Sequence, residues 1–279
     1  MNIEQVDYKE IEEYILNIPK FRKEGSIEDT RKFYEFLGKP GKRSAVVHVA
    51  GTNGKGSTCA YMNSVLVEAG FTVGMFTSPH LVSVRERMRI NHKLITEKEL
   101  GTYFYELRKQ IEKYNQIIVC VENKLQQNNS QSLGRQSEKN NLKAEKLNTE
   151  IVNRRYEPTF YEFLFFMAML YFEHQKPDVI ILETGLGGRL DATNVIDAPR
   201  VAVITEIGKD HMEYLGDTFE KIAEEKAGII KRGSRVVYSL NRQQTAKVIE
   251  RKAGELDVLC KCVEKLEKGD YRFVDKKID

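Results

Sequence analysis

A glycine-rich stretch at residues 51–58, Gly-Thr-Asn-Gly-Lys-Gly-Ser-Thr, constrains the fold of this 279-residue chain most strongly. It follows the apolar run Ala45–Ala50 and precedes a stretch of helical spacing at 58–69. Strand, glycine-rich loop and helix in this order open an α/β nucleotide-binding unit. Glycines let backbone N–H groups surround phosphate oxygens, and Lys55 adds a positive charge for them. Because a glycine separates the lysine from the serine, the loop departs from the strict G-x-x-x-x-G-K-[ST] pattern, and a flexible glycine turn is the alternative.

Strand-like and helix-like segments alternate along the rest of the chain. Beside the strand Ala45–Ala50 and the helix at 58–69, the expected strands are 71–76, 178–183, 201–205 and 235–239, and the expected helices are 4–37, 96–113, 159–174 and 218–230. One more helix and a possible strand at 257–260 follow. This alternation predicts an α/β fold with a mainly parallel sheet and helices on both faces.

One segment, 122–150, interrupts the alternation. It contains no aromatic residue, no Val and no Ile, and ten of its 29 residues are Asn or Gln. Such a composition buries too little surface to offset the entropy of ordering, which indicates an exposed, low-complexity insertion. The run at 117–121 before it fits either a strand or the end of the preceding helix.

Composition excludes several classes of protein. The 44 Lys and Arg against 41 Asp and Glu give a net charge of +3, too small to indicate a nucleic-acid or anionic-membrane partner. The longest apolar run, 163–172, is about half the length of a bilayer crossing, and the polar N-terminal residues are unlike a targeting signal. The four scattered cysteines favour reduced thiols. We therefore expect a cytoplasmic, monomeric protein.

Polar clusters follow three of the expected strands, at 77–80, 183–194 and 208–211. Open α/β sheets bind ligands at this edge. With ATP phosphate oxygens, the hydroxyl of Ser78, the carboxylate of Glu183 and the imidazole of His211 can complete a Mg²⁺ octahedron, although imidazole is an uncommon magnesium ligand. Taken singly, each residue also fits a structural role, as a helix cap, a surface carboxylate or a loop histidine.

Five motifs in order resemble those of the folylpolyglutamate synthase/dihydrofolate synthase family, the folate branch of the Mur ligases. They are 48–57 (HVAGTNGKGS), 77–81 (TSPHL), 158–160 (PTF), 183–194 (ETGLGGRLDATN) and 225–231 (EKAGIIK). The resemblance covers nearly the whole chain outside 122–150. It implies a P-loop-containing Mur-ligase-like fold and an ATP-dependent ligase that joins L-glutamate to a folate or dihydropteroate carboxylate through an acyl phosphate.

The resemblance also implies roles for individual residues. ATP is held by Gly51, Thr52, Asn53, Gly54, Lys55, Gly56, Ser57 and Thr58, and Mg²⁺ is bound by Ser78, Glu183 and His211. Lys226 matches the family's carbamylated lysine. Together with Lys55 and His211 it makes up the catalytic set that the resemblance implies. The acceptor contacts are His80, Thr159, Phe160, Tyr161, Glu162, Leu190, Asp191 and Ala192.

The family's second domain, with its Asp-Gly-Ala-His-Asn motif, has no match here. We therefore expect residues 1–279 to form the ATP-binding domain alone, and to bind ATP without appreciable glutamate ligation. Two alternatives stay open: a nucleotide-binding module without turnover, and a Mur-type ligase for another acid, against which the TSPHL motif argues.

Overall fold

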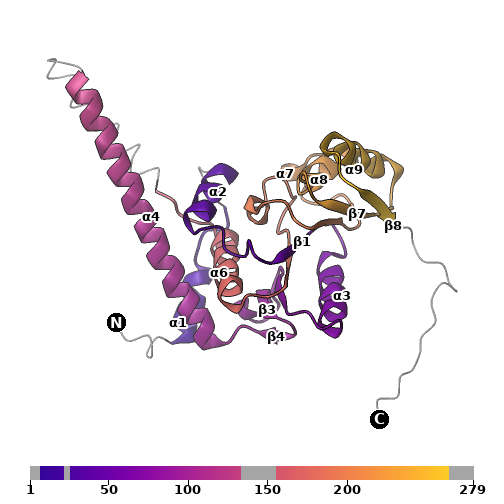
Figure 1. The fold of residues 1–279 in the computed structure, drawn as a ribbon, viewed down its shortest axis with the longest axis horizontal. Helices are drawn as coiled ribbons and strands as arrows, with labels where there is room; N and C mark the ends of the chain where they lie inside the picture. Colours follow the sequence, from indigo (N-terminus) through magenta and orange to yellow (C-terminus); the bar gives the residue numbers. More distant parts are fainter. Residues whose placement is uncertain (1–6, 22–25, 133–154, 264–279) are drawn as a thin grey trace, which may run out of the picture.

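An eight-stranded sheet organises the computed structural model, which describes residues 7–21, 26–132 and 155–263 (Figure 1). Its strand order is β4-β3-β2-β5-β1-β6-β7-β8. The strands are β1 (Ala45–Ala50), β2 (Val73–Phe76), β3 (Met88–Ile90), β4 (Lys93–Leu94), β5 (Val179–Glu183), β6 (Val201–Ile204), β7 (Arg235–Ser239) and β8 (Cys260–Val263). Six of them, from β2 to β8 along the sheet, pair in parallel, which confirms the predicted mainly parallel sheet.

Helices connect the parallel strands. They are α1 (Tyr8–Leu16), α2 (Ile27–Phe36), α3 (Lys55–Glu68), α4 (Glu97–Ser132), α6 (Phe160–Gln175), α7 (Met212–Leu215), α8 (Phe219–Ala227) and α9 (Gln243–Leu256), with short 3₁₀ turns at Val84–Arg87 and Ala192–Val195. The position of β1 in the middle of the sheet places the loop that follows it, and the start of α3, between neighbouring strand ends.

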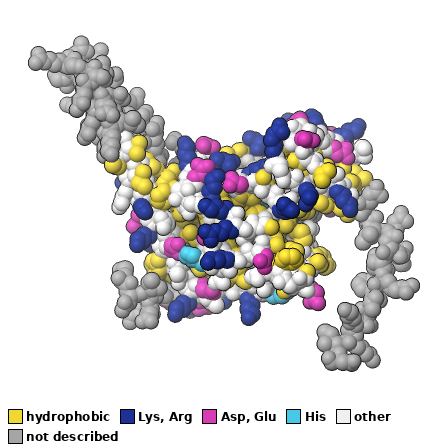
Figure 2. Space-filling model, viewed as in Figure 1, with side chains coloured by type: hydrophobic (Ala, Val, Ile, Leu, Met, Phe, Trp, Pro, Cys, Tyr) yellow, Lys and Arg dark blue, Asp and Glu magenta, His cyan; other side chains and the backbone are white. Residues whose placement is uncertain are grey.

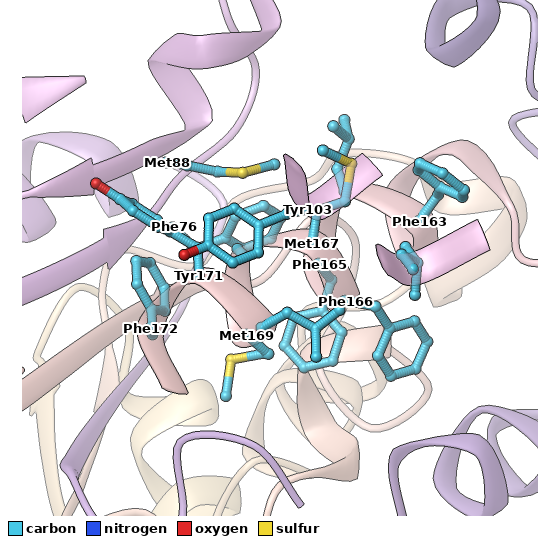
Figure 3. Packing of buried hydrophobic residues seen from close by; sticks show 14 of the residues in the cluster. Phe76, Met88, Tyr103, Phe163, Phe165, Phe166, Met167, Met169, Tyr171 and Phe172 are labelled. Atoms are coloured by element: carbon cyan, nitrogen blue, oxygen red, sulfur yellow. The ribbon is translucent and has the colours of Figure 1, made fainter. Parts of the chain in front are cut away.

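The two faces of the sheet carry separate apolar clusters. On β5, Ile180 and Leu182 lie in the cluster that includes α6, whereas Val179 and Ile181 lie in the cluster that includes α3. Since successive strand residues point to opposite faces, helices cover both faces, as predicted. Figure 3 shows the larger cluster, where aromatic and methionine side chains of α6 lie against Phe76 and Met88.

Two details differ from the sequence-based expectation. The expected helix at 4–37 is two helices, because α1 ends before Pro19 and α2 begins with the capping box of Ser26 and Asp29. The short antiparallel strands β3 and β4 were not predicted. The run at 117–121, which fits either a strand or the end of the preceding helix by sequence, is helical and lies within α4.

The insertion predicted at 122–150 begins inside α4, and its part beyond residue 132 lies outside the described residues. No helix among the described residues is long and apolar enough to cross a membrane. Figure 2 shows basic and acidic side chains interspersed over the viewed face, in keeping with the small net charge.

Candidate active site

The glycine-rich loop lies at the carboxyl end of β1 and is fixed against the end of β6. Gly54 has a φ of 80°, a left-handed conformation that favours glycine, and α3 begins directly after it. A side chain at Gly51 would overlap the Thr205 hydroxyl, which donates a hydrogen bond to the Asn53 carbonyl at 2.8 Å. No described side chain caps the start of α3. Its first N–H groups are therefore available to an anion.

Two lysines converge on this loop. Lys55 Nζ donates to the carbonyls of Gly51 and Thr52 at 3.1 and 3.3 Å. Lys226 Nζ, from α8, donates to the Gly51 carbonyl at 2.8 Å and is only 3% exposed. Burial, together with the charge of Lys55, lowers the pKa of Lys226 to about 8. The fold thus brings Lys226 to a loop carbonyl 175 positions away and places two lysines on the same backbone group.

A buried carboxylate faces the loop from the end of β5. Glu183 is 2% exposed, and its Oε2 accepts a hydrogen bond from the Ser78 N–H at 2.9 Å. A Cβ on Gly56, in the first turn of α3, would lie 3.8 Å from Glu183 Oε1. Burial raises the pKa of Glu183, although Lys55 opposes the shift. The arrangement therefore places an anionic group that lacks full solvation beside the phosphate loop.

His211 is positioned differently from the other two predicted metal ligands. It is exposed, has a left-handed φ of 48°, and lies 3.7 Å from the carboxylate of Asp210. Its loop reaches the phosphate loop through Thr52 Oγ1, which donates to the Gly208 carbonyl at 3.1 Å. Among the described residues, no three His, Cys, Asp or Glu side chains form a metal cluster. The magnesium site of Ser78, Glu183 and His211 stays a prediction.

The predicted acceptor residues 159–162 form the start of α6 and contact Glu183. Thr159 and Glu162 make a reciprocal capping box. Tyr161 donates from its hydroxyl to the Glu183 carbonyl at 2.7 Å, and the Phe160 N–H donates to the Pro19 carbonyl at 2.9 Å. The start of α6 thus connects the predicted metal ligand with the segment between α1 and α2.

The second predicted acceptor segment, 190–192, presents only one of its side chains to solvent. Leu190 is 57% exposed, whereas Asp191 and Ala192 are buried. The Asp191 carboxylate accepts hydrogen bonds from the N–H groups of Gly185 and Leu186 at 2.8 and 2.9 Å. Its oxygens are therefore committed to holding the turn after Glu183.

His80 has a partner that the sequence analysis did not identify. Arg87 Nε donates to His80 Nδ1 at 2.8 Å, and the guanidinium carbon lies 5.3 Å from the centre of the Phe160 ring. Arg87 is only 6% exposed. Burial and Arg87 lower the pKa of His80, which therefore favours the neutral ring. Arg87 is one of several basic residues in its segment, so local sequence gives no signal for its role.

Comparison with known proteins identifies the family. The Mur ligase middle domain matches residues 157–263. The dihydrofolate synthase/folylpolyglutamate synthase of Bacillus subtilis is 36% identical over 247 residues, which are 88% of this chain and 49% of that protein. The chain belongs to the folylpolyglutamate synthase family of the Mur ligases. A folylpolyglutamate synthase of Arabidopsis thaliana is 38% identical over 79% of this chain and 32% of its own length.

The folylpolyglutamate synthase fold is also shared at the level of structure. A solved FPGS complex with AMPPCP and folate has a TM-score of 0.74 and 32% identity, over 92% of this chain and 54% of that one. The chain thus spans about half the length of the Bacillus subtilis protein and of the solved FPGS, and about a third of the Arabidopsis protein. This family membership confirms the resemblance inferred from the five motifs.

Proposed function

We propose that this chain provides the ATP-binding and acceptor-binding parts of a ligase that adds L-glutamate to the carboxylate of a folate or dihydropteroate. The observation that carries the proposal is the junction of three elements at one sheet edge. The phosphate loop of β1 and α3 holds Lys55, β5 ends in Glu183, and Tyr161 of α6 bonds the Glu183 backbone. The nucleotide and acceptor segments therefore meet at one residue, Glu183, whose side chain faces the loop and whose backbone carbonyl accepts from Tyr161.

The chemistry requires activation of the acceptor, because a carboxylate does not react with an amine directly. An oxygen of the acceptor carboxylate attacks the γ-phosphorus of ATP, and ADP leaves. The glutamate amine then attacks the acyl carbon, phosphate leaves, and the amine loses a proton. In this chain the first N–H groups of α3 and the ammonium of Lys55 are positioned to stabilise the phosphate charge.

Magnesium is the divalent ion that we propose for this site, and the residues fit it in part. Glu183 offers a buried anionic oxygen beside the loop, and Ser78 is tied to that carboxylate by its backbone. His211 would join from the exposed loop that contacts Thr52. When bound, the ion would offset charge on the transferred phosphate. Hard oxygen donors suit this ion.

For Lys226 we propose the carbamate that the family resemblance implies. A lysine must be neutral to attack carbon dioxide, and the lowered pKa of about 8 makes the neutral amine accessible near physiological pH. Its amine N would form a bond to the carbon of carbon dioxide and release one proton. Carbon-13 NMR of protein equilibrated with labelled bicarbonate tests this, since a carbamate resonance must vanish in Lys226→Arg.

The proposed function is tested by two binding measurements and one assay on this chain. Calorimetry with AMPPCP and with 7,8-dihydropteroate should detect both ligands, and pteroate should compete with the second. Binding of AMPPCP without any pteroyl compound would favour a nucleotide-binding module or a ligase for another acid. Transfer of radiolabelled L-glutamate measures whether these residues perform ligation unaided. We expect slow transfer at most, because in-line positioning of the amine is worth about 7–11 kcal/mol of the barrier.

A further inference from the structure

A buried hydrogen-bond chain links the central strand to the acceptor segment. His48 lies in β1 and is fully buried, and its Nε2 is 2.7 Å from Thr193 Oγ1. Thr193 Oγ1 in turn donates to Asp191 Oδ1. Asp191 Oδ2 accepts the N–H groups of Gly185 and Leu186. This hydrogen-bond chain therefore runs from the strand that precedes the phosphate loop to the turn that follows Glu183.

The hydrogen bonds to Asp191 determine which atoms of this hydrogen-bond chain carry protons. The two Asp191 oxygens accept four hydrogen bonds, from Gly185, Leu186, and both the N–H and the hydroxyl of Thr193, so the carboxylate has no room for its own proton. Because the single Thr193 hydroxyl hydrogen points to Asp191, its oxygen must accept from His48. His48 is therefore the Nε2–H donor.

The surroundings of the other ring nitrogen of His48 favour a neutral ring. Among the described residues, His48 Nδ1 has no hydrogen-bond partner. Burial and the charge of Lys231 lower the pKa of His48 to about 3. A buried acceptor without a donor costs stability. The favourable contribution of this histidine thus lies in its Nε2–H group.

We propose that His48 is a positioning residue for the acceptor site, which fixes Asp191 and the Gly185–Leu186 turn through the hydroxyl of Thr193. This inference rests on the proposed function for the identity of the acceptor. His48 acts through two other residues and touches no reacting atom. Loss of its Nε2–H removes the donor that holds the Thr193 oxygen in line with Asp191 Oδ1, which weakens one of the four hydrogen bonds to the carboxylate. The three backbone N–H donors to Asp191 remain. Acceptor binding should weaken more than nucleotide binding.

Matched variants separate this positioning role from a contribution to stability. His48→Met keeps the length of the side chain but removes both ring nitrogens, whereas His48→Gln keeps a donor at the position of Nε2. We expect His48→Met to lower the affinity for 7,8-dihydropteroate about tenfold, the effect of one buried hydrogen bond. Its thermal midpoint should stay close to that of the wild type, because loss of the Nε2–H hydrogen bond and removal of the unpartnered Nδ1 have opposite effects on stability. His48→Gln should restore the affinity.

Thr193 offers a second, independent pair of variants. Thr193→Val removes the hydroxyl at nearly constant volume and should weaken dihydropteroate binding, whereas Thr193→Ser should retain it. AMPPCP affinity should stay within about twofold in every variant, since in the described part of the structure the side chains of His48, Thr193 and Asp191 make no hydrogen bond to the phosphate loop. If His48→Met does not fold, the two Thr193 variants and the nitrogen-15 spectrum of the wild type test the positioning role of His48.

Nitrogen-15 NMR of the wild-type histidine rings supplies a spectroscopic readout. We expect the His48 ring, assigned by the loss of its signals in His48→Gln, to be a neutral Nε2–H ring that does not titrate between about pH 5 and about pH 8. The assignment is needed because His80, whose Nδ1 accepts from Arg87, is also an Nε2–H ring when neutral. An Nδ1–H ring for His48 would overturn the inference, as would wild-type dihydropteroate affinity in His48→Met. The inference would also be overturned if His48→Met lowered both the dihydropteroate affinity and the thermal midpoint and His48→Gln restored neither. If wild-type protein binds no dihydropteroate, the proposed function itself is contradicted, and the acceptor role of His48 is contradicted with it.

Discussion

At the scale of single residues, Lys55 is the side chain on which nucleotide binding should depend most. Its ammonium donates to the loop carbonyls of Gly51 and Thr52 and, among the described residues, forms no ion pair, so its removal costs charge and little packing. We expect Lys55→Ala to weaken ATP binding about 100-fold, corresponding to about 3 kcal/mol for lost charge-assisted hydrogen bonds. Calorimetry measures the affinity, and circular dichroism checks the fold. The control is Lys247→Ala on the exposed face of α9, and equal affinity in both variants would remove the phosphate-loop assignment.

Glu183 provides the residue-scale test of the magnesium site. Its carboxylate is the buried anionic group beside the first turn of α3. Glu183→Gln keeps the shape but removes the charge, so it should weaken AMPPCP binding in the presence of Mg²⁺ by about tenfold or more, and metal-free binding much less. Titrations with Mg²⁺ and with EDTA, against Glu68→Gln as control, measure the difference. Equal weakening under both conditions would assign Glu183 a structural role.

Lys226 should make stability depend on pH. Its pKa is about 8 in the folded chain against 10.5 for an ordinary lysine, so between these values the unfolded chain binds more protons. Stability from this residue therefore rises as pH increases from about 8 to 10.5, by up to about 3 kcal/mol, and is lowest where both states are charged. Urea unfolding across that range should show a smaller rise for Lys226→Met. Burial also lowers the pKa of Lys231 to about 8. Urea unfolding of Lys231→Met over the same pH range is therefore the matched comparison for the size of the rise. An unchanged slope in Lys226→Met would contradict the burial of its ammonium.

At the scale of elements, α6 determines the stability of the larger apolar cluster. Its residues 163–172 are all buried, and the Phe166 ring lies 4.9 Å from that of Phe33 in an edge-to-face arrangement. We expect Phe166→Ala to lower the free energy of unfolding by about 3–5 kcal/mol, because it leaves a cavity between α6 and α2. Phe71→Ala, at a ring that is 46% exposed, should change it by about 1 kcal/mol or less. Urea denaturation of both variants checks the contrast, and similar losses would argue against a core position for α6.

At the scale of the whole molecule, one sheet links all the apolar clusters, so the described part of the chain should unfold as a unit. Strand β5 contributes residues to clusters on both faces, and β1 pairs with both β5 and β6. Unfolding followed by circular dichroism and by tyrosine fluorescence should therefore coincide. AMPPCP at about 100 times its Kd should add about 2.7 kcal/mol to the free energy of unfolding of the wild type, and the same concentration about 0.4 kcal/mol in Lys55→Ala, if its affinity is about 100-fold lower. Two separate transitions, of which only one responds to nucleotide, would show that the sheet does not couple its faces.

The sequence by itself determined the features that depend on neighbouring residues. The apolar runs of the parallel strands, the glycine loop before α3 and the continuously apolar α6 are local patterns, and each forms the element it predicted. Local chemistry decides such elements because backbone conformation and period are set within a few residues. The five motifs likewise identified the family before any fold was known, since each is a run of consecutive residues.

Only the tertiary structure decided which distant side chains meet. Lys226 reaches the Gly51 carbonyl across 175 positions, and His48 reaches Thr193 across 145. Arg87 becomes buried beside His80, although Arg85 and Arg89 on either side of it are only partly buried. These contacts follow from strand order, which places β1 between β5 and β6. Strand order is set by the combined burial of many side chains on both faces of the sheet, so it cannot be predicted from any short stretch of sequence.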